Sequence, residues 1–263
     1  MGLRRREFLV SLLAFPLLSR VGRAAELVRS ASYHVDIGIL FGLFTFALDG
    51  AVDEQVDRTA GRYRVLVAGD GPGIDNRIES EGVIQAGRFT PTSTSGLFRV
   101  KGRESRTTIR YDWDQGRAHY QHRSQTFLLG RERLADDVVA IPAGQPLDDI
   151  VTATLNYAEG VLTGNGQGSY ETFVVRRARP KQEGPDDVPP GRYRAEIVPL
   201  RFTVTEDKET GRPVCLLDLT RFSSWASAAN PARIVFGANR RPESIHASLI
   251  LGTAVRITFR RAS

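Results

Sequence analysis

The chain has 263 residues, of which 25% are charged, with one cysteine and a formal net charge of +6. One cysteine excludes an intramolecular disulfide. The excess of positive charge does not indicate a nucleic-acid-binding protein, because such a protein carries its excess in a patch on the folded domain. Here five arginines and one glutamate fall within residues 1–24, so most of the excess belongs to that segment.

Residues 1–24 have the pattern of a secretory signal peptide, with a basic start, a short apolar run and a small-residue cleavage site. The apolar run at 8–18 is about half as long as the roughly 20 residues that span a membrane. We expect cleavage after Ala24. The mature protein is then expected in the periplasm, without a transmembrane segment.

Within this segment, Arg5 and Arg6 precede Glu7, Phe8 and Leu9. This arrangement resembles the twin-arginine export signal, which a receptor reads as an address. The resemblance implies that the protein folds before export and meets the twin-arginine translocation machinery in transit.

Alternating apolar and polar residues predict strands in most of the mature chain. Clear examples are 62–68 and 106–111, where one face is apolar and the other polar, as in an antiparallel sheet. The stretch RYRAEIVPLRFTVTE at 192–206 changes its apolar phase beside Pro199, which predicts a bulge or a bend. Tight turns are expected at 69–76, 112–117 and 205–213, and we expect about ten or more strands in all.

The segment 145–160 has helical spacing instead. Its apolar positions are Leu147, Ile150, Val151, Leu155 and Ala158, which predict an amphipathic helix near 147–158 whose apolar stripe covers the sheet. Pro146 suits the first helical position, and Asp148 and Asp149 are expected in the first turn, where the helix dipole favours acids.

The stretch PDDVPPG at 185–191 is a stiff connection that divides the mature chain. The predicted organisation is a signal peptide at 1–24, an N-terminal β lobe at 25–184 and a C-terminal β lobe at 185–263, the second either separate or continuous with the first. The predicted fold class is all-β and mainly antiparallel, as a curled sheet or half-barrel with one helix.

Four stretches resemble landmarks of the exported bacterial family known as domain of unknown function 3108. They are SASYHVDIGILFGLFTFALDG, SEGVIQAGRFTPTSTSG, TTIRYDWDQGRAHY and PLDDIVTATLNYAEG. The resemblance implies a curled antiparallel sheet similar in outline to periplasmic half-barrels that shield lipid. It implies no catalytic residue.

No strong catalytic motif stands out. The weak candidates are Asp112 and Asp114, paired carboxylates of a kind used on sugars, with His119 nearby. Turn formation is the commoner role of two aspartates at a hairpin tip. His119 and His122 are three apart on a strand and point to opposite faces, so we expect no metal site and no cofactor. Cys215, in an apolar run, is expected to be buried and inert.

Basic residues recur in the segment 99–110, at Arg99, Lys101, Arg103, Arg106 and Arg110. They form either an ordinary solvated strand face or a surface that binds an anionic envelope component through arginine hydrogen bonds.

Two functional hypotheses follow. The first is a non-enzymatic periplasmic binding or envelope-associated protein, in which the curled sheet and the helix at 147–158 form an apolar pocket for a lipid-like or hydrophobic ligand, or whose basic strand face binds an anionic envelope ligand. The alternative is a hydrolase that acts on cell-wall or glycan material through Asp112, Asp114 and His119.

Overall fold

The computed structural model describes residues 27–180 and 183–261. The predicted signal peptide, with Arg5, Arg6, Phe8, Leu9 and Ala24, lies outside the described residues. The described strands are β1 (Leu27–Ile39), β2 (Phe44–Asp57), β3 (Arg62–Gly71), β4 (Ile74–Gln85), β5 (Arg88–Val100), β6 (Arg103–Asp112), β7 (Arg117–Gln125), β8 (Glu132–Ala140), β9 (Leu147–Asp148), β10 (Ser169–Arg177), β11 (Ala195–Glu206), β12 (Pro213–Leu217), β13 (Ala232–Phe236), β14 (Pro242–Ser248) and β15 (Ala254–Arg261). The described helix is α1 (Ile150–Ala158).

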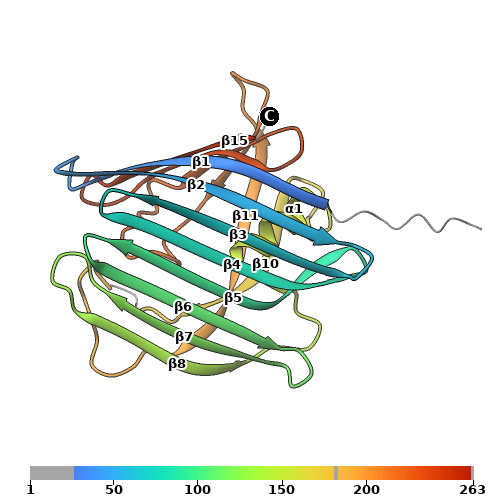
Figure 1. The fold of residues 1–263 in the computed structure, drawn as a ribbon, viewed down its shortest axis with the longest axis horizontal. Helices are drawn as coiled ribbons and strands as arrows, with labels where there is room; N and C mark the ends of the chain where they lie inside the picture. Colours follow the sequence, from blue (N-terminus) through green and yellow to red (C-terminus); the bar gives the residue numbers. More distant parts are fainter. Residues whose placement is uncertain (1–26, 181–182, 262–263) are drawn as a thin grey trace, which may run out of the picture.

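All described strands belong to one unclosed sheet, in the order β8 to β1, then β15 down to β9. Neighbouring strands are antiparallel except the short β9, which is parallel to β10. Figure 1 shows β1 to β8 as a curved wall, with β10, β11 and α1 behind it. This arrangement confirms the predicted all-β, mainly antiparallel curled sheet with one helix. Strands on both sides of residues 184–191 belong to this sheet, because β10 pairs with β11.

The alternating residues divide between the two faces of the wall as expected for an antiparallel sheet. Tyr63 and Val65 of β3 are buried, whereas Arg62 and Arg64 are exposed. The predicted turns also form. The turn at 112–117 joins β6 to β7, and Gly211 has a positive φ in the turn between β11 and β12.

The strands β10 and β11 are covered on both faces, which explains the phase change beside Pro199. Val198 packs in a cluster with residues of α1 and β12 to β14, whereas Ile197 packs against a second cluster of β6 to β8. The expected bulge is wrong, because the β10–β11 register runs without a shift from Arg177 to Ser169. Pro199 is tolerated because β12 pairs with β11 only from Thr203 onward, so this part of β11 has a single strand neighbour.

The helix is shorter than predicted and presents a different face. Asp149 is its N-cap and accepts hydrogen bonds from the backbone N–H groups of Val151 and Thr152. Asp148 lies in β9, so the expectation that both acids occupy the first turn is wrong, as is the placement of Pro146 at the first helical position. Ile150 is exposed. The buried helical residues are Thr152, Ala153, Leu155, Asn156 and Tyr157.

The start of α1 is tied to the wall by a buried polar network. Asp148 receives hydrogen bonds from Arg88 at 2.7 Å, Thr172 at 2.6 Å and Asn156 at 3.0 Å. The Asn156 side chain also donates to the carbonyl and accepts from the N–H of Phe89 in β5. This network fixes the helix against β5 and β10, where apolar contact alone would leave several arrangements.

The edge strand β8 is covered by the chain that leads into β11. The N–H of Tyr193 donates to the Leu134 carbonyl at 2.8 Å, and the N–H of Ala195 donates to the Asp137 carboxylate at 2.9 Å. Covering an edge in this way removes its unpaired backbone groups from further strand pairing. Glu183, beside this contact, is buried and bonded to Tyr193 at 2.6 Å.

Candidate functional site

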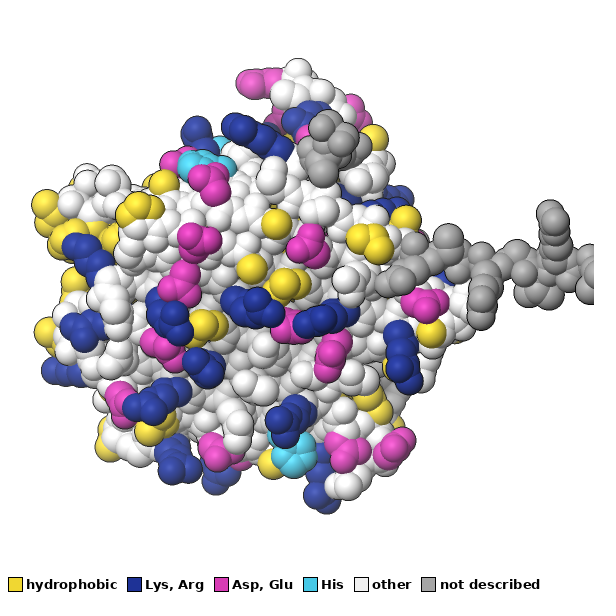
Figure 2. All heavy atoms as spheres, in the orientation of Figure 1, with side chains coloured by type: hydrophobic (Ala, Val, Ile, Leu, Met, Phe, Trp, Pro, Cys, Tyr) yellow, Lys and Arg dark blue, Asp and Glu magenta, His cyan; other side chains and the backbone are white. Residues whose placement is uncertain are grey.

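The outer face of β6, β7 and β8 carries polar side chains and two hollows. The register places its side chains in rows across the three strands. One row is Arg106, Arg123 and Leu134, the next is Thr108, Gln121 and Asp136, and the third is Arg110, His119 and Val138. Figure 2 shows this wall with basic and acidic side chains spread over it.

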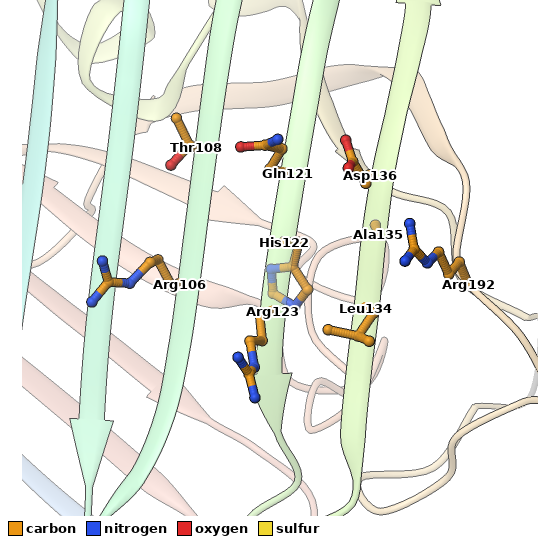
Figure 3. A pocket seen from close by; sticks show the side chains of 9 residues that line it. All are labelled: Arg106, Thr108, Gln121, His122, Arg123, Leu134, Ala135, Asp136 and Arg192. Carbon is orange, nitrogen blue, oxygen red and sulfur yellow. The ribbon is translucent and has the colours of Figure 1, made fainter.

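Two adjoining hollows of about 300 and 320 Å³ lie on this face. They share Thr108 and Gln121, so they form one groove, here called the outer groove. It is lined by Arg106, Thr108, Arg110, Tyr111, Asp112, His119, Gln121, His122, Arg123, Leu134, Ala135, Asp136 and Arg192. Figure 3 shows Thr108, Gln121 and Asp136 in a row, with Arg106, Arg123 and Arg192 beside them.

The outer groove places like charges opposite each other. Arg106 and Arg123 are direct cross-strand partners, an arrangement that is destabilising in an antiparallel sheet. Each has a carboxylate at the border of the groove, Glu104 at 3.3 Å from Arg106 and Glu132 at 3.0 Å from Arg123. Each of the two guanidinium groups is therefore paired with a carboxylate and held in place at the border of the groove.

Two further arginines supply unneutralised charge. Arg110 lines one hollow and Arg192, just before β11, lines the other. Both are exposed, and among the described residues no carboxylate pairs with either guanidinium. Arginine donates planar, bidentate hydrogen bonds that match carboxylate and phosphate groups. Thr108 and Gln121 between them add neutral donors and acceptors.

The five basic residues predicted from the sequence separate into three places. Arg106 and Arg110 line the outer groove. Arg99 forms ion pairs with Glu104 at 3.0 Å and with Asp75 at 3.6 Å. Lys101 and Arg103 lie at the turn between β5 and β6, where the Lys101 Nζ is 3.7 Å from the centre of the Phe44 ring.

The three weak catalytic candidates do not assemble as a set. Asp112 and His119 line the same hollow, whereas Asp114 lies in the following turn and lines neither hollow. Asp112 also accepts a hydrogen bond from the Gln115 N–H at 2.9 Å, which is the turn-forming role. Asp112 is the only carboxylate among the residues that line this hollow. The paired carboxylates that glycan hydrolysis uses are therefore not brought together there.

The remaining titratable candidates are structural. His122 lines the outer groove but lies in the strand phase opposite to His119. Its ring bonds Thr107 at 2.8 Å and Ser124 at 2.9 Å, and burial lowers the pKa of its imidazole to about 4. Cys215 is buried as expected, and burial raises the pKa of its thiol to about 12. Within residues 27–180 and 183–261, no three histidine, cysteine or acidic side chains gather as metal ligands would. In the same residues, no helix is long and apolar enough to cross a bilayer.

Sequence reasoning missed Gln121, Arg123, Asp136 and Arg192. Alternation along β7 could have placed Gln121 and Arg123 on the face of His119, because all three share one strand phase. Asp136 and Arg192 join the groove only through the β7–β8 register and the docking of the chain before β11.

The fold is similar to that of a solved structure from another protein. It is a crystal structure of a β-barrel-like protein of domain of unknown function 1849 from Brucella abortus, with a TM-score of 0.42 and 10% sequence identity. The match covers 90% of this chain and 98% of that one. No family model matches the chain, and no curated protein matches it. Membership of the family that the sequence resembles stays a prediction.

Proposed function

We propose that the protein is a non-enzymatic binding protein of the periplasmic envelope that holds an acidic glycan in the outer groove. The observation that carries the proposal is that the groove holds two exposed arginines without a carboxylate partner among the described residues, Arg110 and Arg192, with the ion-paired Arg106 and Arg123 beside them. A fold that keeps such charges together on an open surface gains stability from a bound anion. The export signal supports the location in the periplasm.

The mixture of charged and neutral groups favours a sugar chain over a simple ion. Thr108, Gln121 and Asp136 lie between the two arginine rows and offer donors and acceptors for hydroxyl groups. Arg106 and Arg110 are four residues apart on one strand, which separates their Cα atoms by about 13 Å, so an extended anionic chain is needed to reach both side chains. The interior behind this wall is occupied by packed apolar clusters, which favours the outer face as the binding surface.

Replacing Arg110 and Arg192 with glutamine tests this proposal. Each substitution is expected to weaken binding of an oligogalacturonate probe about tenfold, because a hydrogen bond to a charged group contributes about 1.5–3 kcal/mol. Isothermal titration calorimetry on the purified protein measures the change. Binding by the unmodified protein is expected to weaken with added salt, since exposed charges are screened.

Arg64→Gln is the matched control. Arg64 lies on β3, outside the groove, and is bonded to Glu79 at 2.7 Å. It is expected to leave affinity unchanged. A neutral oligosaccharide of the same length is expected not to bind. Equal affinity in all three variants, or no binding of the acidic probe by the unmodified protein, would contradict the proposal.

A further inference from the structure

One end of the sheet exposes a group of large apolar side chains on turns. They come from the β1–β2 turn, the β7–β8 loop and the β14–β15 turn, and are here called the apolar tips: Phe41 (84% exposed), Leu43 (73%), Leu129 (60%), Leu128 (46%) and Leu251 (44%). Figure 2 shows apolar side chains gathered at the edge where Figure 1 draws the β1–β2 turn. Contiguous exposed apolar surface of this kind marks an interaction site.

Contacts between the loops show that the tips lie together. Gly38 of β1 pairs with Ala254 of β15, so the β1–β2 and β14–β15 turns are neighbours, and Phe41 lies against Gly252. The Phe44 ring is 6.1 Å from that of Phe127, which brings in the β7–β8 loop.

The loops that carry the tips are held in place. The Phe127 ring meets that of Trp225 at 6.2 Å, and the Ile250 N–H donates to the Trp225 carbonyl at 2.7 Å. The Leu129 N–H donates to Asp186 at 2.7 Å. The side chains therefore remain exposed on anchored backbone.

The backbone of the tips is also unfavourable for these residue types. Leu40, Phe41 and Leu251 have φ values of 53°, 56° and 55°. This left-handed conformation costs roughly 1–2 kcal/mol in a residue other than glycine. Unfavourable backbone and exposed apolar side chains at the same place indicate a functional constraint.

Basic residues border the apolar tips. Lys101 is exposed and lies over the Phe44 ring, Arg103 lies against Gly130, and Arg131 is exposed at the end of the β7–β8 loop. Among the described residues, no carboxylate forms an ion pair with any of these three side chains. The nearby Asp186 is turned toward backbone N–H groups of the β7–β8 loop.

We propose that the apolar tips dock this end of the protein onto an anionic phospholipid bilayer. Protruding tips from three separate loops fit a deformable apolar phase, whereas a helical peptide partner needs a groove. In this arrangement Phe41, Leu43 and Leu129 enter the boundary between headgroups and acyl chains, and Lys101, Arg103 and Arg131 meet the phosphates. The inference is independent of the outer groove, which uses other residues.

Vesicle sedimentation tests the docking. The purified protein is mixed with phosphatidylcholine vesicles that contain about a quarter phosphatidylglycerol, and with phosphatidylcholine alone. The double variant Phe41→Ser/Leu43→Ser is expected to bind the anionic vesicles at least about tenfold more weakly. It lacks two apolar side chains that the bilayer buries when the protein docks. Lys101→Glu/Arg131→Glu is expected to lose a similar factor on anionic vesicles and little on neutral ones.

Two controls separate this effect from others. Val28→Ser removes an exposed apolar side chain at the opposite end of β1, and Arg110→Gln alters only the outer groove. Both are expected to bind vesicles like the unmodified protein. Every variant keeps the same N-terminal segment, so a difference between variants reports on the substituted position. Circular dichroism checks that each variant is folded.

A Leu43→Trp variant tests insertion directly. Its fluorescence is expected to be quenched by vesicles of brominated lipid, because the side chain then lies among the acyl chains. Absence of that quenching, absence of binding to anionic vesicles, or equal binding by Phe41→Ser/Leu43→Ser and Val28→Ser would overturn the proposal.

Discussion

Replacing Asp148 with alanine is expected to destabilise the fold by about 3–5 kcal/mol, because it leaves the Arg88 guanidinium without its buried counter-charge. The Asp148 side chain is fully buried and accepts from Arg88, Thr172 and Asn156. Removal also leaves two neutral donors without their acceptor, which adds a desolvation cost. A loss of this size is a large part of the stability of a typical domain. The midpoint of urea unfolding measures it.

Asp70→Ala is the control for this prediction. Asp70 is an exposed aspartate on β3, and its loss is expected to change the free energy of unfolding by less than about 0.5 kcal/mol. The double variant Arg88→Met/Asp148→Asn is expected to recover part of the loss, because it removes both charges and keeps an acceptor for Asn156. Unfolding of Asp148→Ala at the same urea concentration as Asp70→Ala would show that this network does not tie the helix to the wall.

Lowering the pH from 7 to 5 is expected to cost about 2 kcal/mol of stability through His122 alone. Burial, with a contribution from Arg177 and Arg133, lowers the pKa of this imidazole to about 4. Its ring bonds to Thr107 at 2.8 Å and Ser124 at 2.9 Å. In the unfolded chain the His122 imidazole has the ordinary pKa of about 6.5. Between pH 6.5 and 4 it is therefore protonated in the unfolded chain and neutral in the folded one. The stability of the fold is therefore undiminished by His122 above pH 6.5, and it falls as the pH is lowered toward 4 because protonation favours the unfolded chain.

The measurement is the difference between variants in the slope of stability against pH. His122→Gln is expected to flatten the slope between pH 7 and 5, whatever it costs at pH 7. His119→Gln changes an exposed imidazole on the outer face of the same strand and is expected to keep the slope of the unmodified protein. Identical slopes in the two variants would show that His122 is not a partly buried, neutral group in the folded protein.

Glu183 affects the stability of the fold in a separate, lower pH range. Burial raises the pKa of its carboxyl, but hydrogen bonds from Arg177 and Tyr193 outweigh burial and hold the pKa at about 2. Because the folded pKa lies below the ordinary value, its contribution is present above pH 4.5 and is lost as the pH falls toward 2. The two windows are distinguishable, since the His122 effect is nearly complete before the Glu183 effect begins.

The local architecture follows from patterns within short stretches of the sequence. Alternation in segments such as 62–68 predicted strands, and the turn residues at 112–117 and 205–213 predicted where they reverse. These signals are local, because the period of a strand and the backbone of a turn depend on neighbouring residues. The burial of Cys215 and the opposite directions of His119 and His122 followed from the same local rules.

The face that each element buries and the side chains that meet depend on the tertiary structure and cannot be derived from local patterns. The phase change beside Pro199 predicts a bulge or a bend from the sequence alone, because a single strand does not show that both of its faces are covered by different clusters. The expected position of Asp148 in the first helical turn is wrong: Asp148 holds β9, α1 and β5 together, and its partner Arg88 lies 60 residues away in the sequence. The outer groove and the apolar tips likewise exist only because strand register and loop contacts bring distant residues together.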